Sequence, residues 1–245
     1  MKMHTLLDYI FIPNGRCPIC FRVLFFTKEF ICSHCKIELE TIQGKRCEKC
    51  SKQLHSHDMH YCNDCLQMDY SYTSGFSLYQ YEGNIKKIVQ LIKFGDCPKL
   101  GIYMGSILGE HLMLQQWICD IQLIIPVPLH INRQQERGYN QAEKIALGVV
   151  QKFKNSPILS HVDLCLEYLT RYKDNSHQIH LNKLERFKNV KQIFKVEDKE
   201  SIKNKTILLI DDVYTTGATI QSCSETLIKN GAGRVYFAVL ARGNI

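Results

Sequence analysis

From residue 71 onward, short apolar runs alternate with segments whose apolar residues recur at helical spacing. Four stretches are typical of strands: "SGFSLYQYEG", which ends at Gly83, "IQLIIPVPL", "TILLI" and "RVYFAVLA". Between them, "NIKKIVQLIKF" places Ile85, Ile88, Val89 and Ile92 on one helical face. "NQAEKIALGVVQKF" and "IQSCSETLIKN" show the same spacing, and Gly231 ends the latter. This order predicts an α/β fold with a doubly wound, mainly parallel sheet.

Before residue 66 the pattern is dominated by cysteine. Four Cys-x-x-Cys pairs recur at a constant interval of fifteen residues, and eleven residues separate each pair from the next. Two such pairs supply the four thiolates that structural zinc prefers, so the array predicts two zinc ions. The simplest assignment is sequential. It places Cys17, Cys20, Cys32 and Cys35 on one ion and Cys47, Cys50, Cys62 and Cys65 on the other.

Several alternatives to the sequential zinc assignment exist. An interleaved arrangement, first pair with third and second with fourth, fits the spacing equally well. Disulfides are disfavoured because no secretory signal precedes the array and cytosolic thiols stay reduced. A redox dithiol needs only one pair, and His55, His57 and His60 are surplus to eight cysteines. Because so short a segment buries little apolar surface, we expect metal to fold it. We predict two domains, one with two four-cysteine zinc sites over 1–70 and an α/β domain over 71–245.

Composition changes this picture in two ways. The net charge is +7, of which residues 1–70 contribute +1 and the remainder +6, so the α/β domain suits a phosphorylated ligand or nucleic acid. A solvated lysine-rich surface would give the same charge. No apolar run is long enough to span a bilayer, and we expect a cytoplasmic protein.

The stretch "TILLIDDVYTTGATI" combines a buried strand, two carboxylates and a hydroxyl-rich loop. We expect the strand to cover 206–210 and end at Asp211 and Asp212, and a helix to begin near Thr219. Amides and hydroxyls of Thr215, Thr216, Gly217, Ala218 and Thr219 would then form an anion cradle at a positive helix end. Paired carboxylates repel phosphate but suit sugar hydroxyls, a metal or a developing cation. A 5-phosphorylated ribose meets all these requirements.

Other interpretations of this stretch account for less of it. A nucleotide-hydrolase P-loop needs a Gly-Lys-Ser/Thr ending, and the chain contains no such triplet. Carboxylates that bind only Mg²⁺, or that cap the turn, would leave the Thr-Thr-Gly-Ala-Thr run unexplained.

"LLIDDVYTTGAT" resembles the phosphoribosyl-pyrophosphate (PRPP) signature of type I phosphoribosyltransferases. The whole chain resembles the ComF family, linked to natural competence and DNA uptake in bacteria. The matching features are the four Cys-x-x-Cys pairs, "YEGNIKKIVQLIKFGD", "PVPLHINRQQERGYNQA", "NSHQIHLNKLERFKN", the acidic signature and the closing "VLAR". The resemblance implies a type I phosphoribosyltransferase-like sheet preceded by a double zinc ribbon.

The resemblance also assigns residues to a PRPP site that binds Mg²⁺. Asp211 and Asp212 would hold the ribose hydroxyls and support a cationic sugar, and Thr215, Thr216, Gly217, Ala218 and Thr219 would hold the 5-phosphate. Val213 and Tyr214, between them, would complete the PRPP-binding signature. Arg133 and Arg137 would face the diphosphate with Asn140 and Gln141 nearby, although arginines there could simply cover the next helix. A closing loop would contribute Arg171, Lys173, Gln178, Arg186 and Asn189.

Two functions remain open at this point. The protein is either a transferase that moves phosphoribose to a nitrogen acceptor, or a competence factor that binds single-stranded DNA and keeps the PRPP site for regulation. Proteins of the DNA-uptake machinery are possible partners under both hypotheses.

Overall fold

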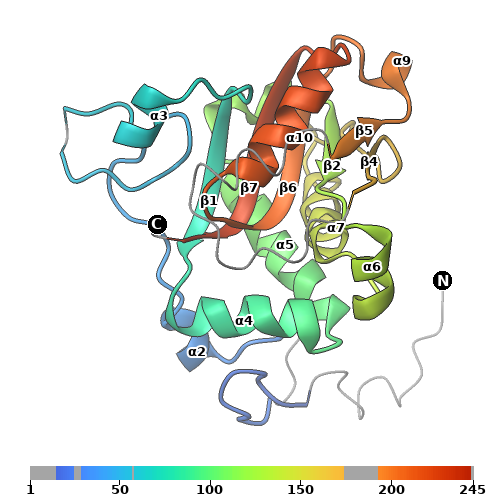
Figure 1. Cartoon of the computed structure of the whole chain (residues 1–245). Coiled ribbons are helices and arrows are strands. Elements are labelled where there is room, and N and C mark those ends of the chain that lie inside the picture. Colours follow the sequence, from blue (N-terminus) through green and yellow to red (C-terminus); the bar gives the residue numbers. More distant parts are fainter. Residues whose placement is uncertain (1–14, 25–28, 57, 174–192, 244–245) are drawn as a thin grey trace.

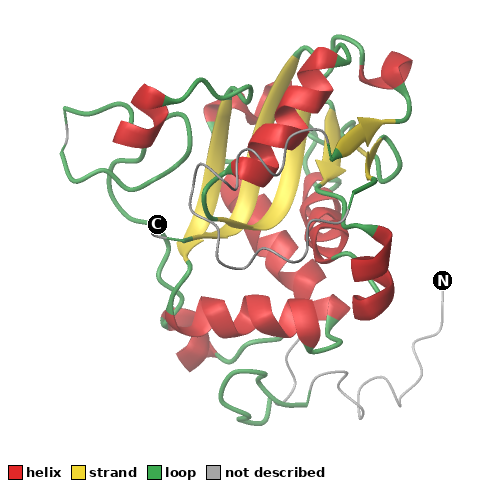
Figure 2. Ribbon diagram, viewed as in Figure 1, coloured by secondary structure: helices red, strands yellow, loops and turns green. Residues whose placement is uncertain are grey.

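The computed structural model describes residues 15–24, 29–56, 58–173 and 193–243. Its centre is a five-stranded sheet in which every neighbouring pair is parallel, in the order β1-β7-β6-β2-β3 (Figures 1 and 2). The strands are β1 (Ser74–Gln80), β2 (Leu123–Pro126), β3 (Asp163–Leu164), β6 (Thr206–Tyr214) and β7 (Arg234–Arg242). The predicted α/β fold with a parallel sheet is therefore confirmed.

Helices cover both faces of this sheet. In Figure 1, α10 (Ala218–Lys229) lies in front, α5 (Pro98–Leu112) and α7 (Gln141–Phe153) lie behind, and α4 (Gly83–Phe94) runs below the carboxyl ends of the strands. The shorter elements are α2 (Ser33–Ile37), α3 (Asn63–Gln67), η1 (Gln116–Asp120), α6 (Ile131–Arg137), α9 (Lys199–Ile202) and the antiparallel pair β4 (Leu169–Arg171) and β5 (Phe194–Val196).

Strand β6 shows why the apolar runs are continuous. Leu208 and Ile210 are buried in the core shared with α5 and α7, whereas Ile207 and Leu209 are buried in the core shared with α10. Successive strand residues point to opposite faces, so a strand covered on both sides is apolar at every position.

Helices α5 and α7 pack closely because glycines face each other. A Cβ on Gly105 would lie 2.0 Å from Ile145 O, and one on Gly148 would lie 2.0 Å from Ile102 O. Either substitution would push the helices apart and disturb the core behind β2 and β6. The spacing of apolar residues in the sequence did not lead to a predicted helix at α5.

Several element boundaries differ from the predictions. Strand β6 continues through the two aspartates to Tyr214, since it pairs with β7 up to Tyr214 and Arg242. Strand β1 ends at Gln80, and Gly83 instead begins α4. The predicted apolar face of α4 is confirmed, because Ile85, Ile88, Val89 and Ile92 are all buried.

The Cys-rich segment docks against the outer edge of β1. Thr41 forms an antiparallel bridge with Tyr79, and Ile42 N–H donates to Leu78 O over 3.0 Å. Arg46 donates to Ser77 O over 2.9 Å. These contacts cover an edge that would otherwise expose unpaired backbone groups. Across the part of the chain that the structure describes, no helix combines the length and apolar character needed to cross a membrane.

Candidate functional site

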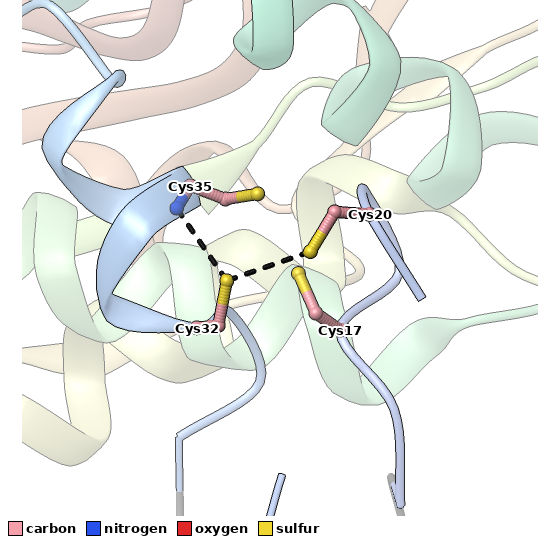
Figure 3. Close-up of side chains that lie close together, drawn as sticks. All are labelled: Cys17, Cys20, Cys32 and Cys35. Atoms are coloured by element: carbon pink, nitrogen blue, oxygen red, sulfur yellow. Dashed lines mark hydrogen bonds between the residues drawn. The ribbon is translucent and has the colours of Figure 1, made fainter. Parts of the chain in front are cut away.

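The eight cysteines gather into two groups of four. The first contains Cys17, Cys20, Cys32 and Cys35, and the second contains Cys47, Cys50, Cys62 and Cys65, with the ligand atoms of each group within 4.8 Å of one another. Figure 3 shows the first group, in which the four sulfur atoms face a common centre. The structure thus has the sequential arrangement, and the interleaved alternative is excluded.

The spacing within each group fits zinc. Cys20 Sγ lies 3.6 Å from Cys32 Sγ, and Cys50 Sγ lies 3.6 Å from Cys62 Sγ. Four sulfurs at a Zn–S distance of about 2.3 Å are about 3.8 Å apart in a tetrahedron. His55 and His60 are exposed and belong to neither group, while His57 lies outside the described residues. The two groups are consistent with two zinc sites.

The Thr215–Thr219 loop comprises the turn after β6 and the first two residues of α10. Gly217 is the N-cap of α10 in a left-handed conformation (φ 81°), and a Cβ there would overlap the side chain of Tyr214. Thr216 Oγ1 accepts a hydrogen bond from Ala218 N–H over 3.4 Å. A twelve-residue helix therefore begins at the loop, with the positive end of its dipole directed at it.

A cavity of about 300 Å³ opens beside this loop. It lies at the carboxyl ends of β2 and β6, where the chain turns outward in two directions, through α7 to β3 and through α10 to β7. Doubly wound sheets bind ligands at such switch points. The lining residues are Tyr81, Lys93, Val127, Pro128, Leu129, Arg137, Gln141, Arg171, Asp211, Asp212, Val213, Thr215 and Thr219.

The two aspartates form the acidic side of the cavity. Asp212 N–H donates to Asp211 Oδ1 over 2.8 Å, and Lys93 Nζ lies 2.9 Å from Asp212 Oδ1. Within the described part of the chain, the buried Asp212 Oδ2 has no hydrogen-bond partner. Burial, and then the charge of Asp212, raise the pKa of Asp211 to about 7. The pair can therefore take up further donors or a cation.

Comparisons with known proteins cover nearly the whole chain. Residues 6–66 match the double zinc ribbon domain, and residues 135–245 match the phosphoribosyl transferase domain. Competence protein F of Haemophilus influenzae is 27% identical over 94% of this chain and 97% of its own length. Over nearly its whole length the chain therefore resembles the competence proteins of the ComF family.

Two more relatives align with this chain over similar lengths. DNA utilization protein YhgH of Salmonella typhimurium is 26% identical over 93% of the chain and 97% of its own length. Competence protein ComFC of Bacillus subtilis is 26% identical over 94% of the chain and 91% of its own length. A solved hypoxanthine phosphoribosyltransferase of Staphylococcus aureus, 15% identical, overlaps 62% of the chain and 68% of its own length with a TM-score of 0.32, too low to inform the site.

The structure places only some of the basic residues predicted for the PRPP site beside the cavity. Arg137 and Gln141 line the cavity, and Arg137 Nη1 donates to Gln141 Oε1 over 2.8 Å. Arg171 also lines it, at the end of β4. Arg133 lies one turn earlier on α6 and is not among the lining residues. The cavity thus brings together two of the predicted arginines and Gln141.

Asn140 has a structural role in this arrangement. Its Oδ1 caps α7 by accepting from Ala142 N–H over 2.9 Å, and its Nδ2 donates to Val127 O over 3.0 Å. Lys173 is exposed, with its Nζ 5.4 Å from the centroid of the Tyr172 ring. Gln178, Arg186 and Asn189 lie outside the described residues.

Sequence reasoning missed Lys93. Burial alone would lower the pKa of Lys93, but the neighbouring Asp212 raises it above its usual value, so the side chain is a cation inside the cavity. Lys93 belongs to "YEGNIKKIVQLIKFGD", one of the blocks that resemble the ComF family. The helical spacing of apolar residues predicts only that Lys93 lies outside the apolar face of α4. The one hint in the sequence that it approaches the site is its place next to the buried Ile92.

Proposed function

We propose that residues 211–219 of this protein bind a ligand that carries a 5-phosphorylated ribose, with PRPP and Mg²⁺ as the first candidate. The supporting observation is the cavity itself, which is lined by the Asp211–Asp212 pair and by Thr215 and Thr219 of the loop. The loop amides and hydroxyls suit the 5-phosphate, and the carboxylates suit ribose hydroxyls.

The cations around the cavity support a second anionic group on the ligand. Lys93, Arg137 and Arg171 line it together with the two aspartates. Burial lowers the pKa of Arg137, but a guanidinium remains protonated and its fork matches phosphate oxygens. We assign Arg137 and Arg171 to the diphosphate of PRPP, with Gln141 holding Arg137 in place.

Magnesium fits the acidic side of the same cavity. Carboxylate oxygens are the ligands that Mg²⁺ prefers, and the buried Asp212 Oδ2 is without a hydrogen-bond partner among the described residues. When bound with PRPP, Mg²⁺ would neutralise part of the diphosphate charge.

For a transferase, the carbon–oxygen bond between ribose C1 and diphosphate would break as a nitrogen acceptor forms its bond to C1. Asp211 and Asp212 would support the positive charge that develops on the sugar, and Arg137 would stabilise the departing diphosphate. The nitrogen acceptor loses a proton in this step.

The biological role that we propose is handling of DNA in natural competence, in the cytoplasm, by a two-domain protein divided near residue 70. Three relatives carry competence or DNA utilization in their names. The charge of +6 on residues 71–245 favours nucleic-acid contact by the α/β part over the near-neutral ribbon. In a second, non-catalytic function, a 5-phosphorylated DNA end would occupy the PRPP cavity.

Three measurements test these proposals. Calorimetry should show PRPP binding that requires Mg²⁺ and is abolished by Asp211→Asn with Asp212→Asn, and unchanged binding would refute the site. PRPP should displace a labelled 5-phosphorylated single strand but not affect a 5-hydroxyl strand of the same sequence if DNA enters the cavity. Pyrophosphate release against a panel of bases and amines would establish transfer, whereas binding without release would favour the second function.

A further inference from the structure

Arg242, at the end of β7, joins the second cysteine group to the strand that carries the proposed site. It is 4% exposed, its Nη1 donates to Cys50 O over 2.7 Å, and its Cζ lies 4.4 Å from the centroid of the Tyr214 ring. Tyr214 is its register partner on β6. Four thiolates around a zinc ion would carry net negative charge, and this charge would stabilise a buried guanidinium beside Cys50.

Tyr214 in turn supports the Thr215–Thr219 loop. Its hydroxyl oxygen lies only 2.1 Å from the position that a Cβ on Gly217 would take. The Tyr214 ring therefore packs directly against the N-cap of α10. The same hydroxyl bonds Tyr72 Oη over 2.9 Å. A small enclosed space is lined jointly by cysteines of the second group, Tyr214, Thr215 and Thr216, which shows that metal group and loop are neighbours.

A second connection runs through Gln221, in the first turn of α10. Its Oε1 accepts from Ser71 N–H over 2.8 Å, and its Nε2 donates to Ser71 Oγ over 3.1 Å. Ser71 follows shortly after Cys65, the last ligand of the second group. Gln221 therefore ties the first turn of α10 to the segment that directly follows the second cysteine group.

The first cysteine group has a different environment. Cys17, Cys32 and Cys35 are buried in the core shared with α4 and α5, and nearby Phe30 packs on Tyr103 at 5.3 Å between ring centroids. Cys47, Cys50 and Cys62 are instead buried in the core that contains Tyr72 and Tyr214.

We propose that Arg242 is a positioning residue that couples the second zinc site to the Thr215–Thr219 loop, so that zinc there and a phosphoribosyl ligand at the loop stabilise each other. The first zinc site is outside this coupling. This inference rests on the proposed ligand site. Coupling of this kind is reciprocal, so it is measurable from either end.

From the ligand end, Arg242→Met should lower Mg²⁺–PRPP affinity about tenfold while two zinc equivalents remain bound. In the unchanged protein, PRPP should slow hydrogen exchange in residues 47–65 but not in 17–35, and this protection should be lost in Arg242→Met and partly restored in Arg242→Lys. The matched control is Arg234→Met, which removes an exposed arginine from the other end of β7. If Arg242→Met does not fold, Tyr72→Phe is the alternative variant, because it removes the hydrogen bond between Tyr72 and Tyr214. It should weaken the PRPP-dependent protection of residues 47–65 from hydrogen exchange.

From the zinc end, no ligand is needed. Cys62→Ser should speed exchange of the amides of residues 215–219, and Cys32→Ser should not. If PRPP fails to bind while this asymmetry holds, the proposed ligand is wrong but the coupling stands. Equal effects of the two cysteine variants, or PRPP protection that survives Arg242→Met, would overturn the coupling.

Discussion

Lys93 and Asp212 form an ion pair inside the candidate site, with 2.9 Å between Nζ and Oδ1. The side chain of Lys93 is 22% exposed and that of Asp212 is 5% exposed, so the pair is largely withdrawn from water. It joins the end of α4 to the end of β6 and offsets the charge of two adjacent carboxylates. A ribose or a Mg²⁺ ion at Asp212 would have to share the carboxylate with Lys93 or displace it.

Removing the lysine should destabilise the protein. Lys93→Met leaves a buried carboxylate without its cation, and we expect the free energy of unfolding to fall by about 2 kcal/mol at pH 7.5, less than for a fully buried pair because Lys93 is partly exposed. Asp212→Asn added to Lys93→Met should recover most of the loss. Urea unfolding of the unchanged protein, the two single variants and the double variant measures the interaction energy between Lys93 and Asp212. If the two single variants lose amounts of unfolding free energy that add up to the loss of the double variant, the ion pair contributes nothing to stability.

The raised pKa of Asp211 predicts a pH dependence. Burial, and then Asp212, raise this pKa from 3.8 to about 7, so between these values the folded state holds a proton that the unfolded state releases. Its contribution to stability is thus greatest at low pH and is lost as the pH rises through 7. Relative to Asp211→Asn, the unchanged protein should lose stability between about pH 4 and 7 and change little above that, by at most about 1.4 kcal/mol per pH unit. A difference that is flat or rises with pH would contradict the assignment. Zinc-linked effects cancel in this comparison.

Gly217→Ala should disrupt the loop. The added Cβ would overlap the Tyr214 ring, and φ of 81° costs an L-residue about 1–2 kcal/mol. We expect lower stability and loss of PRPP binding in calorimetry. Gly231→Ala is the matched control, because its φ is also positive (103°) but a Cβ there meets nothing closer than 4.0 Å. Equal PRPP affinities in the two variants would show that the loop is not the ligand site.

We expect Asn140 to affect mainly stability and Arg137 to affect mainly PRPP affinity. Asn140→Ala removes the cap of α7 and the bond to Val127 O, and we expect the free energy of unfolding to fall by about 1–3 kcal/mol with a small change in affinity. Arg137→Gln should weaken PRPP binding with little change in stability. Urea unfolding and calorimetry on both variants check this, and the reverse pattern would move Asn140 into the ligand site.

The zinc assignment predicts two distinct stoichiometries. Cys20→Ser with Cys35→Ser affects the first group alone, so elemental analysis should find one zinc equivalent. Cys20→Ser with Cys50→Ser affects both groups and should leave none. An interleaved pairing would give the opposite results, because Cys20 and Cys50 would then share an ion.

Much of the candidate site was readable as local pattern. The interval between Cys-x-x-Cys pairs predicted two four-cysteine groups, and the run from Asp211 to Thr219 predicted a strand end, a loop and a helix start in that order. These features depend on residues close together in the chain, where spacing alone constrains geometry. The sequence predicted an end of β6 that is too early, because charged residues after an apolar run usually mark the end of a buried strand. In the structure, pairing with β7 keeps Asp211 and Asp212 within β6.

By itself, the sequence determined the parallel α/β class and the presence of two groups of four cysteines, and it predicted the loop that could receive a phosphate. Which cysteine pairs share a group was decided by the structure. Only the tertiary structure decided that Lys93 meets Asp212, that Asn140 caps a helix instead of facing the cavity, and that the second cysteine group, through Arg242, lies against the loop. The reason is physical: periodicity records which face of an element is buried. Which distant residues meet there depends on strand order and on how closely the helices pack, and glycines such as Gly105 and Gly148 set that packing only once both helices are in place.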